Sequence, residues 1–283
     1  MGYRFMLFPN FRSKALTLSY DDGVKQDERL LSIMSKNGIK GTFNINSGLF
    51  APDESCNRNR MTAKQALELY KSHDCEVACH GVCHLSLRHV SRELAVADVI
   101  NDRINLENMF GGVIRGMAYA NGSYDDATVE ILKNCGIAYS RTCITTEKFE
   151  IPTDWLRLPT TCHHNNPKLM ELLEEFLSQK SNGYYWSNAN LPKLFYLWGH
   201  SYEFDNNDNW NVIEEFCERA GGREDVWYAT NIEIYNYVKA FDGLQFAANG
   251  KSVYNPSNLD VCVDYMGLKV LAKAGQITSL KVK

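Results

Sequence analysis

Carboxylate and imidazole side chains stand at three separate places in the chain, each just after a short apolar run. The first place holds two adjacent carboxylates, Asp21 and Asp22; the second holds His80 and His84, and the third holds His200. Two imidazoles four residues apart, together with one carboxylate, are a ligand set that binds a catalytic divalent metal and leaves coordination positions open. Because adjacent carboxylates diverge, one can bind the metal while the other faces a substrate.

Each of these features alone has a simpler interpretation. Asp21-Asp22-Gly23 is a favourable turn after a strand, and a histidine pair is often a partly exposed loop. His200 alone could cap a strand or belong to the core. In parallel α/β proteins, however, the carboxyl ends of the strands meet at one face, where the site lies. Three runs that each end in such residues therefore predict one common centre.

The elements that would position this centre alternate along the chain. Short apolar runs, each followed by a helical pattern, lie at residues 15–20, 41–46, 76–79, 116–119, 137–139, 194–198 and 226–229. The first three helices are expected to end at the Asn37-Gly38 stop, to start at the Thr62 cap, and to run from the Ser91 cap to about Met109. Four more helices are expected over residues 125–134, 168–178 (with Pro167 at its start), 211–219 and 231–241. Seven such units predict an α/β fold with a parallel sheet, and a barrel is compatible with this length.

The pattern changes at residue 244. Two short apolar runs flank Asn249-Gly250, a dipeptide typical of tight hairpin turns, and further short strands follow. We therefore expect residues 1–243 to form the catalytic domain and residues 244–283 to form a small antiparallel β extension packed on it.

Composition narrows the class of protein. The 283 residues are 45% hydrophobic and 12% aromatic, which indicates a large packed core. A net charge of −4 without a long basic run argues against a nucleic-acid partner. With no apolar run of about 18 residues and no export signal, the sequence predicts no membrane contact and a cytoplasmic location. The nine cysteines are expected to be reduced thiols, and no oligomeric state follows from the sequence.

Three motifs resemble one known family, the polysaccharide deacetylases, which are carbohydrate esterases with a NodB homology domain. Residues 17–23 (TLSYDDG) resemble the T-F-D-D-G motif, residues 80–84 (HGVCH) resemble H-S/T-x-x-H after a short strand, and residues 197–200 (LWGH) resemble the late L-x-H motif. The resemblance spans roughly residues 14–241. It implies a distorted (β/α)7 barrel.

The resemblance also implies a role for each residue. Asp22, His80 and His84 become the ligands of one divalent metal, Asp21 the catalytic base and His200 the general acid. The expected ion is Zn²⁺, with Co²⁺, Ni²⁺, Fe²⁺ and Mn²⁺ as alternatives. The implied reaction is removal of N- or O-linked acetyl groups from a carbohydrate by a metal-activated water.

The chain departs from this family at the third motif, usually R-P-P-Y-G. Residues 117–122 (MAYANG) place Ala118 where the arginine belongs and Asn121 where a tyrosine would serve the oxyanion through its backbone N–H. Asp154-Trp155 is a weak match to the fourth motif. We assign Tyr119, Asn121 and Trp155 to substrate or oxyanion contacts.

In the family, the missing arginine orients the base. Arg115 and Arg157 are the candidates to replace it, and the sequence does not distinguish them. The pair His163-His164 lies before a predicted helix and could add a ligand or a substrate contact. We interpret it instead as a solvated loop.

Other kinds of site and function stay open. The spacing of Cys75, Cys79 and Cys83 is compatible with a thiolate metal site or a haem attachment, but a matching second cysteine pair is missing. The same metal centre could hydrolyse a non-sugar amide such as a cyclic ureide. A third alternative is a non-catalytic carbohydrate-binding protein, which would have no use for a general acid.

Overall fold

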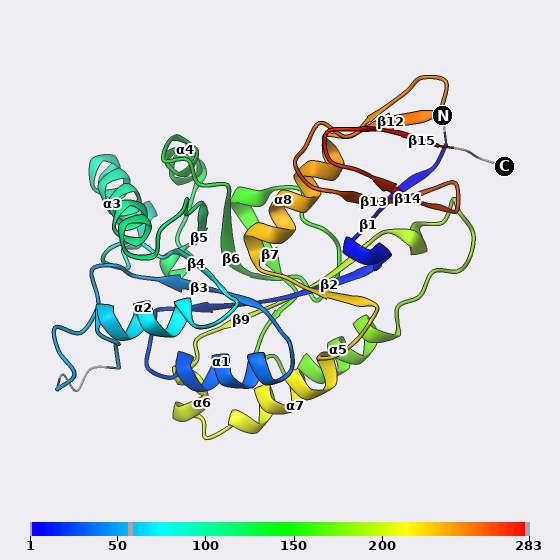
Figure 1. The fold of residues 1–283 in the computed structure, drawn as a ribbon. Helices are drawn as coiled ribbons and strands as arrows, with labels where there is room; N and C mark the ends of the chain where they lie inside the picture. Colours follow the sequence, from blue (N-terminus) through cyan, green and yellow to red (C-terminus); the bar gives the residue numbers. More distant parts are fainter. Residues whose placement is uncertain (1, 56–58, 281–283) are drawn as a thin grey trace.

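A parallel sheet forms the centre of the computed structural model, which describes residues 2–55 and 59–280. Its strands follow the order β7-β6-β5-β4-β3-β2-β9-β8, and β10 also pairs with β2 (Figure 1). The strands are β2 (Lys14–Asp21), β3 (Gly41–Ile45), β4 (Glu76–Cys79), β5 (Gly116–Ala118), β6 (Tyr139–Thr145), β7 (Leu158–Thr160), β8 (Cys162–His163), β9 (Lys193–Gly199) and β10 (Val226–Tyr228).

Helices connect these strands and cover the sheet, with α1, α5, α6 and α7 on one side of it and α3 and α4 on the other (Figure 1). The α-helices are α1 (Asp27–Lys36), α2 (Ala63–Lys71), α3 (Arg92–Phe110), α4 (Asp126–Asn134), α5 (Leu169–Ser178), α6 (Tyr202–Asn206), α7 (Trp210–Ala220) and α8 (Asn231–Asp242). Short 3-10 helices are η1 (Pro9–Phe11), η2 (Leu87–His89), η3 (Ala120–Gly122), η4 (Trp155–Arg157) and η5 (Asn188–Asn190). The caps predicted at Thr62 and Ser91 are confirmed, since each side chain accepts a backbone N–H at the start of a helix, and Thr230 caps α8 in the same way.

One short segment closes the sheet into a distorted barrel. Strands β7 and β8 are separated only by Thr161, yet β7 pairs with β6 and β8 pairs with β9, at the opposite edge. We call residues 158–163 the closing segment. The predicted β/α barrel is confirmed, but the closing segment was not expected, because Pro159 and the polar residues around it mask the apolar pattern of a strand.

Strand β2 lies at the centre of the core, and all eight of its residues are buried. Both faces of a parallel strand in such a sheet are covered, so its side chains cannot alternate between core and solvent. Leu16 and Leu18 are fully buried in this way, whereas the polar residue Asp21 stands at the carboxyl end of the strand. The core therefore fixes the position of the residue predicted as the base.

Antiparallel sheets follow the barrel, as predicted for residues 244–283. One sheet contains β11 (Gln245–Phe246), β12 (Ser252–Tyr254) and β15 (Ile277–Ser279); the other contains β1 (Arg4–Leu7), β13 (Val261–Tyr265) and β14 (Leu268–Ala272). Strand β1 thus joins the N-terminal segment to the C-terminal strands. The division into domains at residue 243 stays a prediction.

Two expectations about the whole chain can be compared with the described residues. Eight cysteines lie in that part, and all are free thiols; Cys56 lies outside it. Among the helices of the described ranges, none has the length and apolar character needed to cross a membrane.

Asp27, at the start of α1, should make the stability of the protein depend on pH. It is fully buried, and burial raises its pKa to about 7, although bonds from Ser201 and Tyr70 lower it. Because the folded-state pKa exceeds the unfolded value of 3.8, its stabilising contribution is complete below about pH 4 and is lost as the pH rises to about 7. Between these two pH values, the free energy of unfolding measured with urea should fall in both proteins. The fall should be smaller in Asp27→Asn than in wild type, by about 2–4 kcal/mol. Equal losses in both proteins would contradict this prediction.

Candidate active site

Asp21 and Asp22 are placed by the end of β2. Asp21 is its last residue, and the backbone N–H of Asp22 donates to the carbonyl of Asn44 on β3 (2.9 Å). Asp22 then adopts a left-handed conformation with a φ of 85°. Such conformations are costly for residues other than glycine and concentrate at functional sites. The chain therefore turns sharply between the two carboxylates.

His80 follows β4 and is held at both its backbone and its ring. Its backbone N–H donates to the carbonyl of Ile45 (3.1 Å) and to the carboxylate of Asp102 (2.9 Å). Its Nδ1 lies 2.8 Å from the carbonyl oxygen of Ala118, which can only accept, so the ring proton is on Nδ1. Nε2 then carries the lone pair, is buried, and has no hydrogen-bond partner among the described residues. This is the arrangement expected of a metal ligand.

The loop that returns from His80 to His84 is fixed by α3. Asp98 of that helix accepts the backbone N–H of Cys83 (3.0 Å). Gly81 has a φ of 80°, and a Cβ atom there would collide with the carboxylate of Asp98, so this position requires glycine. His84 has a left-handed φ of 56°, and its ring lies 4.8 Å from that of His80, centroid to centroid.

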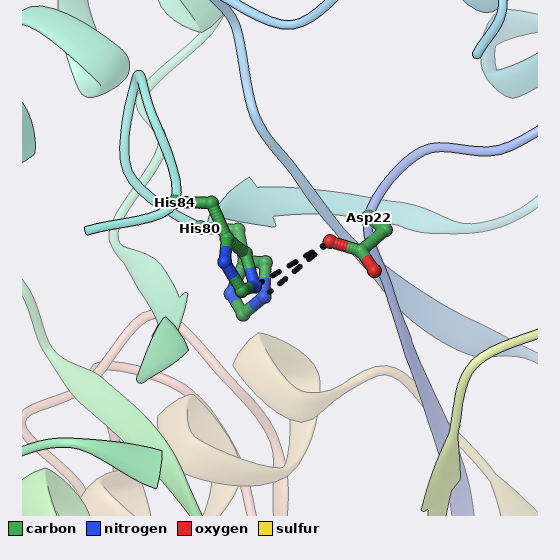
Figure 2. Close-up of side chains that lie close together, drawn as sticks. All are labelled: Asp22, His80 and His84. Atoms are coloured by element: carbon green, nitrogen blue, oxygen red, sulfur yellow. Dashed lines mark ion pairs between the residues drawn. The ribbon is translucent and has the colours of Figure 1, made fainter. Parts of the chain in front are cut away.

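Asp22, His80 and His84 converge on one point (Figure 2). Oδ1 of Asp22 lies 3.9 Å from Nε2 of His80 and 3.6 Å from Nε2 of His84. Burial lowers the pKa of His80, which keeps this imidazole neutral and able to bind a cation. Two imidazole nitrogens and one carboxylate oxygen at these separations suit a divalent ion with bonds of about 2.0–2.2 Å. The residues present therefore fit the metal that the motifs imply.

Asp21 lies beside this ligand set, in a short ion pair with the buried Arg141. The amide of Asn44 also donates to its other carboxylate oxygen (2.9 Å). Burial alone would raise the pKa of Asp21, but the charges of Arg141, His80 and His200 outweigh burial and lower it to about 2. Asp21 is therefore ionised at neutral pH, as a base must be.

Arg141 contacts the predicted base, and neither of the two arginines considered from the sequence does so in the structure. Arg115 is exposed and lies near the carbonyl of Gly136, while Arg157 pairs with Asp154 at the surface. Arg141 was missed because β6 extends to Thr145, well beyond the apolar run at residues 137–139. A strand read to its full length, with alternate side chains facing the barrel, would have identified it.

Replacing Arg141 by lysine should distinguish the effect of its positive charge on Asp21 from the effect of its planar shape. Lysine keeps the positive charge but loses the planar guanidinium that fixes the orientation of Asp21. For Arg141→Lys we expect kcat to fall about tenfold or more, since a misoriented base is a poor catalyst, with metal content unchanged. Steady-state kinetics and metal analysis check this, with the exposed Arg115→Lys as the matched control. An unchanged kcat would mean that Arg141 acts only through its charge.

His200 follows β9 and lies close to Asp21. Its Nε2 is 3.9 Å from Oδ2 of Asp21, and its Nδ1 is 3.4 Å from Oε2 of Glu203. Burial lowers the pKa of His200, but Glu203 and Asp21 outweigh burial, and the net pKa lies above the ordinary 6.5. The surroundings of His200 therefore favour its protonated form, next to the predicted base.

The residues assigned to substrate or oxyanion contacts lie in different settings. Tyr119 is buried, and its hydroxyl donates to the carbonyl of Leu156 (2.8 Å). Trp155 is buried too, with its ring packed edge-on against Tyr235 at 5.2 Å. Asn121 is exposed and has a left-handed φ of 56°. The contacts of Tyr119 and Trp155 are core contacts, so a substrate role for these three residues stays a prediction.

A cavity of about 560 Å³ opens beside the ligand set. It is lined by Asp22, and its wall includes the rings of Phe50 and Tyr202 and the guanidinium of Arg60. Nη2 of Arg60 lies 3.3 Å from Oδ1 of Asp22. Aromatic faces with a few polar groups are usual in ligand sites of this volume.

Two clusters in the described part of the chain have the residue types and spacing of metal sites. One is Asp22, His80 and His84; the other is formed by His163, His164 and Glu203. Neither contains Cys75, Cys79 or Cys83, so the thiolate alternative gains no support. His164 is 1% exposed, and the expectation of a solvated loop is wrong for this residue.

Comparison with known proteins adds to this geometry. Residues 9–140 match the family model described as polysaccharide deacetylase. No curated protein matches the chain. Among solved structures, the Streptococcus pyogenes deacetylase PplD, in complex with acetate, is 23% identical over 45% of this chain, with a TM-score of 0.41. The alignment spans only 55% of that protein.

The alignments with two further solved structures cover most of both chains. A candidate polysaccharide deacetylase from Mycobacterium smegmatis is 16% identical, with 84% of this chain and 94% of that chain covered and a TM-score of 0.57. The Xyl-CE4 domain of a multidomain xylanase from the hindgut metagenome of Trinervitermes trinervoides is 13% identical, with 80% and 92% covered and a TM-score of 0.50. These two likenesses support the fold. Through the match of residues 9–140, somewhat less than half of the chain, this protein is similar in sequence to the polysaccharide deacetylase family.

Proposed function

We propose that this protein is a metal-dependent hydrolase that removes acetyl groups from a carbohydrate. The observation that carries the proposal is the convergence of Asp22, His80 and His84 next to an ionised Asp21 and a protonatable His200. The family match supports an acetylated carbohydrate as the substrate class. A cytoplasmic location stays a prediction.

The three ligand residues would hold one divalent ion. Two imidazoles and one carboxylate favour Zn²⁺, with Co²⁺, Ni²⁺, Fe²⁺ and Mn²⁺ as alternatives. When bound, the ion supplies a Lewis acid that polarises the acetyl carbonyl and lowers the pKa of a water. The neutral Nε2 of His80 and the carboxylate of Asp22 are the groups of this chain that prepare the site for it.

The remaining residues move protons. Asp21, kept ionised by Arg141, accepts the proton of the attacking water. His200 keeps its own proton because Glu203 and Asp21 raise its pKa, and it delivers that proton to the departing amine or alcohol. Base and acid lie 3.9 Å apart, so both reach one small reacting group. The division of roles requires the environment to push the pKa values of the two groups apart, and here the pKa of Asp21 is lowered while that of His200 is raised.

The altered third motif supports one second candidate. Ala118 and Asn121 stand where the family has an arginine and a tyrosine, and the carbonyl oxygen of Ala118 contacts Nδ1 of His80 in the ligand set. Hydrolysis of a non-sugar amide, such as a cyclic ureide, uses the same metal, base and acid. The two candidates differ only in the substrate.

The test compares acetate release from N- and O-acetylated oligosaccharides with ureide turnover, using the same purified protein. We expect acetate release that is lost on chelation of the metal and restored by Zn²⁺. Ureide turnover without acetate release would favour the second candidate. Binding of oligosaccharide without turnover of either kind, by metal-loaded protein, would identify a non-catalytic binder.

A further inference from the structure

A cluster of two histidines and one glutamate adjoins His200, and the mechanism above gives its two histidines no role. Oε2 of Glu203 lies 3.1 Å from Nε2 of His163 and 3.0 Å from Nε2 of His164. The same oxygen lies 3.4 Å from Nδ1 of His200. One carboxylate oxygen therefore faces three imidazole nitrogens. Burial would raise the pKa of Glu203, but its close contacts with the three imidazoles hold it far below the ordinary range.

The other ring nitrogens show which protons these imidazoles carry. Nδ1 of His163 accepts the backbone N–H of Asn165 (3.1 Å), so the proton of the neutral ring is on Nε2 and faces Glu203. Nδ1 of His164 lies 3.3 Å from the hydroxyl of Tyr20. Burial raises the pKa of Tyr20 well above its usual value, so this phenol keeps its proton and can donate it to Nδ1. Both rings can then donate from Nε2 to the carboxylate.

A second metal ion is the alternative occupant of this cluster, whose spacing suits one. A ligating imidazole keeps a proton on its other nitrogen and donates it, as His80 does to the carbonyl of Ala118. The other nitrogen of His163 instead accepts a backbone N–H. The cluster is therefore built to hold a carboxylate rather than a cation.

The cluster forms where two strands and one helix come together, β8, β9 and α6. His163 ends β8, the backbone N–H of His164 donates to the carbonyl of Trp198 on β9 (2.9 Å), and Glu203 lies in α6. A Cβ atom at Gly199 would collide with the ring of His164, so glycine permits the close approach. The ring nitrogens of His164 and His200 lie within hydrogen-bond distance of the Glu203 carboxylate, but the geometry of these contacts is not that of a hydrogen bond. Catalytic contacts of this kind often align only when substrate binds.

We propose that His163 and His164 are positioning residues that hold the carboxylate of Glu203, which in turn orients His200. Fixing Nδ1 of His200 against Glu203 directs Nε2 toward Asp21 and the reacting group. The inference rests on the proposed function, because it assigns His200 the role of general acid. It gives a role to a histidine pair that the family motifs leave unassigned.

Substitution of His163 tests the proposal, since this residue is partly exposed and its replacement should be tolerated. His163→Leu removes the donor, whereas His163→Gln keeps a side-chain N–H. We expect kcat of His163→Leu to fall about 10- to 100-fold with KM nearly unchanged, and His163→Gln to recover most of the loss. The exposed His89→Leu is the control for general effects of losing a histidine. Equal activity of wild type and His163→Leu, or no recovery by glutamine, would overturn the proposal.

Imidazole ¹⁵N NMR of His200 gives a readout that needs no turnover. The titratable groups around His200 are the carboxylates of Glu203 on α6 and of Asp21 and Asp22 at the end of β2, the imidazoles of His163 and His164, and the phenol of Tyr202. In Glu203→Gln we expect the protonated Nδ1 signal of His200 to weaken and its titration to move to lower pH. An unchanged titration would contradict the proposal.

Metal analysis separates the remaining outcomes. If His163→Leu contains one equivalent of metal less than wild type, the cluster is a second metal site and the proposal is wrong. If wild type releases no acetate, the proposed function fails, while the NMR comparison still decides whether Glu203 orients His200. The two failures are therefore distinguishable.

Discussion

Asp21→Asn should lower kcat for acetate release by about 10²- to 10⁴-fold, the usual contribution of a general base. Asparagine has nearly the shape of aspartate but cannot accept the proton of the attacking water. KM should change little, because Asp21 is buried behind the ligand set and its role begins with proton transfer. Initial-rate kinetics on an acetylated oligosaccharide give both constants.

Metal content is the control for Asp21→Asn. Asp22, His80 and His84 are unchanged, so the variant should bind the metal as wild type does. Its stability should fall by about 3–5 kcal/mol at most, because the buried charge of Arg141 loses its partner. Assays therefore belong well below the melting temperature of the variant. Full turnover by metal-loaded Asp21→Asn would show that another group is the base.

His80→Ala should lose both the metal and the activity. Nε2 of His80 is buried and available for a cation, and alanine leaves only Asp22 and His84 as ligands. Since disturbing even an outer partner of a ligand costs about 10- to 100-fold in metal affinity, loss of the ligand itself should cost more than about 100-fold. Metal analysis after dialysis and titration with Zn²⁺ measure the effect.

The exposed His89→Ala is the matched control, because it also removes one imidazole from the chain. It should retain wild-type metal content and acetate release. Chelation of wild type should reproduce the inactivity of His80→Ala, and added Zn²⁺ should restore only wild type. Normal metal binding by His80→Ala would mean that the centre lies elsewhere.

The parts of the site that could be predicted from the sequence are local. Asp21 and Asp22 follow an apolar run that does form a strand, and His80 follows another; the rule that parallel strands end at one face then brings them together. The capped helices could be predicted for the same reason, since a cap such as Thr62 and its partner Gln65 lie three residues apart.

The parts that could not be predicted depend on long-range pairing. Arg141 reaches Asp21 across 120 residues, and the apolar run before it gives no sign of such a partner. The approach of His164 to Glu203 likewise depends on the closing segment joining β9, while the sequence around Pro159 indicates no strand. Local periodicity specifies which face a side chain occupies, but not which distant side chain it meets.

The closing segment has a consequence for how activity would be lost. The metal ligands follow β2 and β4, inside the uninterrupted part of the sheet, whereas His163 and His164 belong to the seam where the barrel closes with two short strands. Short strands with few paired residues open at lower free energy than a central strand. Mild heat or denaturant should therefore release the acid half of the site first, giving a protein that still binds its metal but no longer turns over substrate.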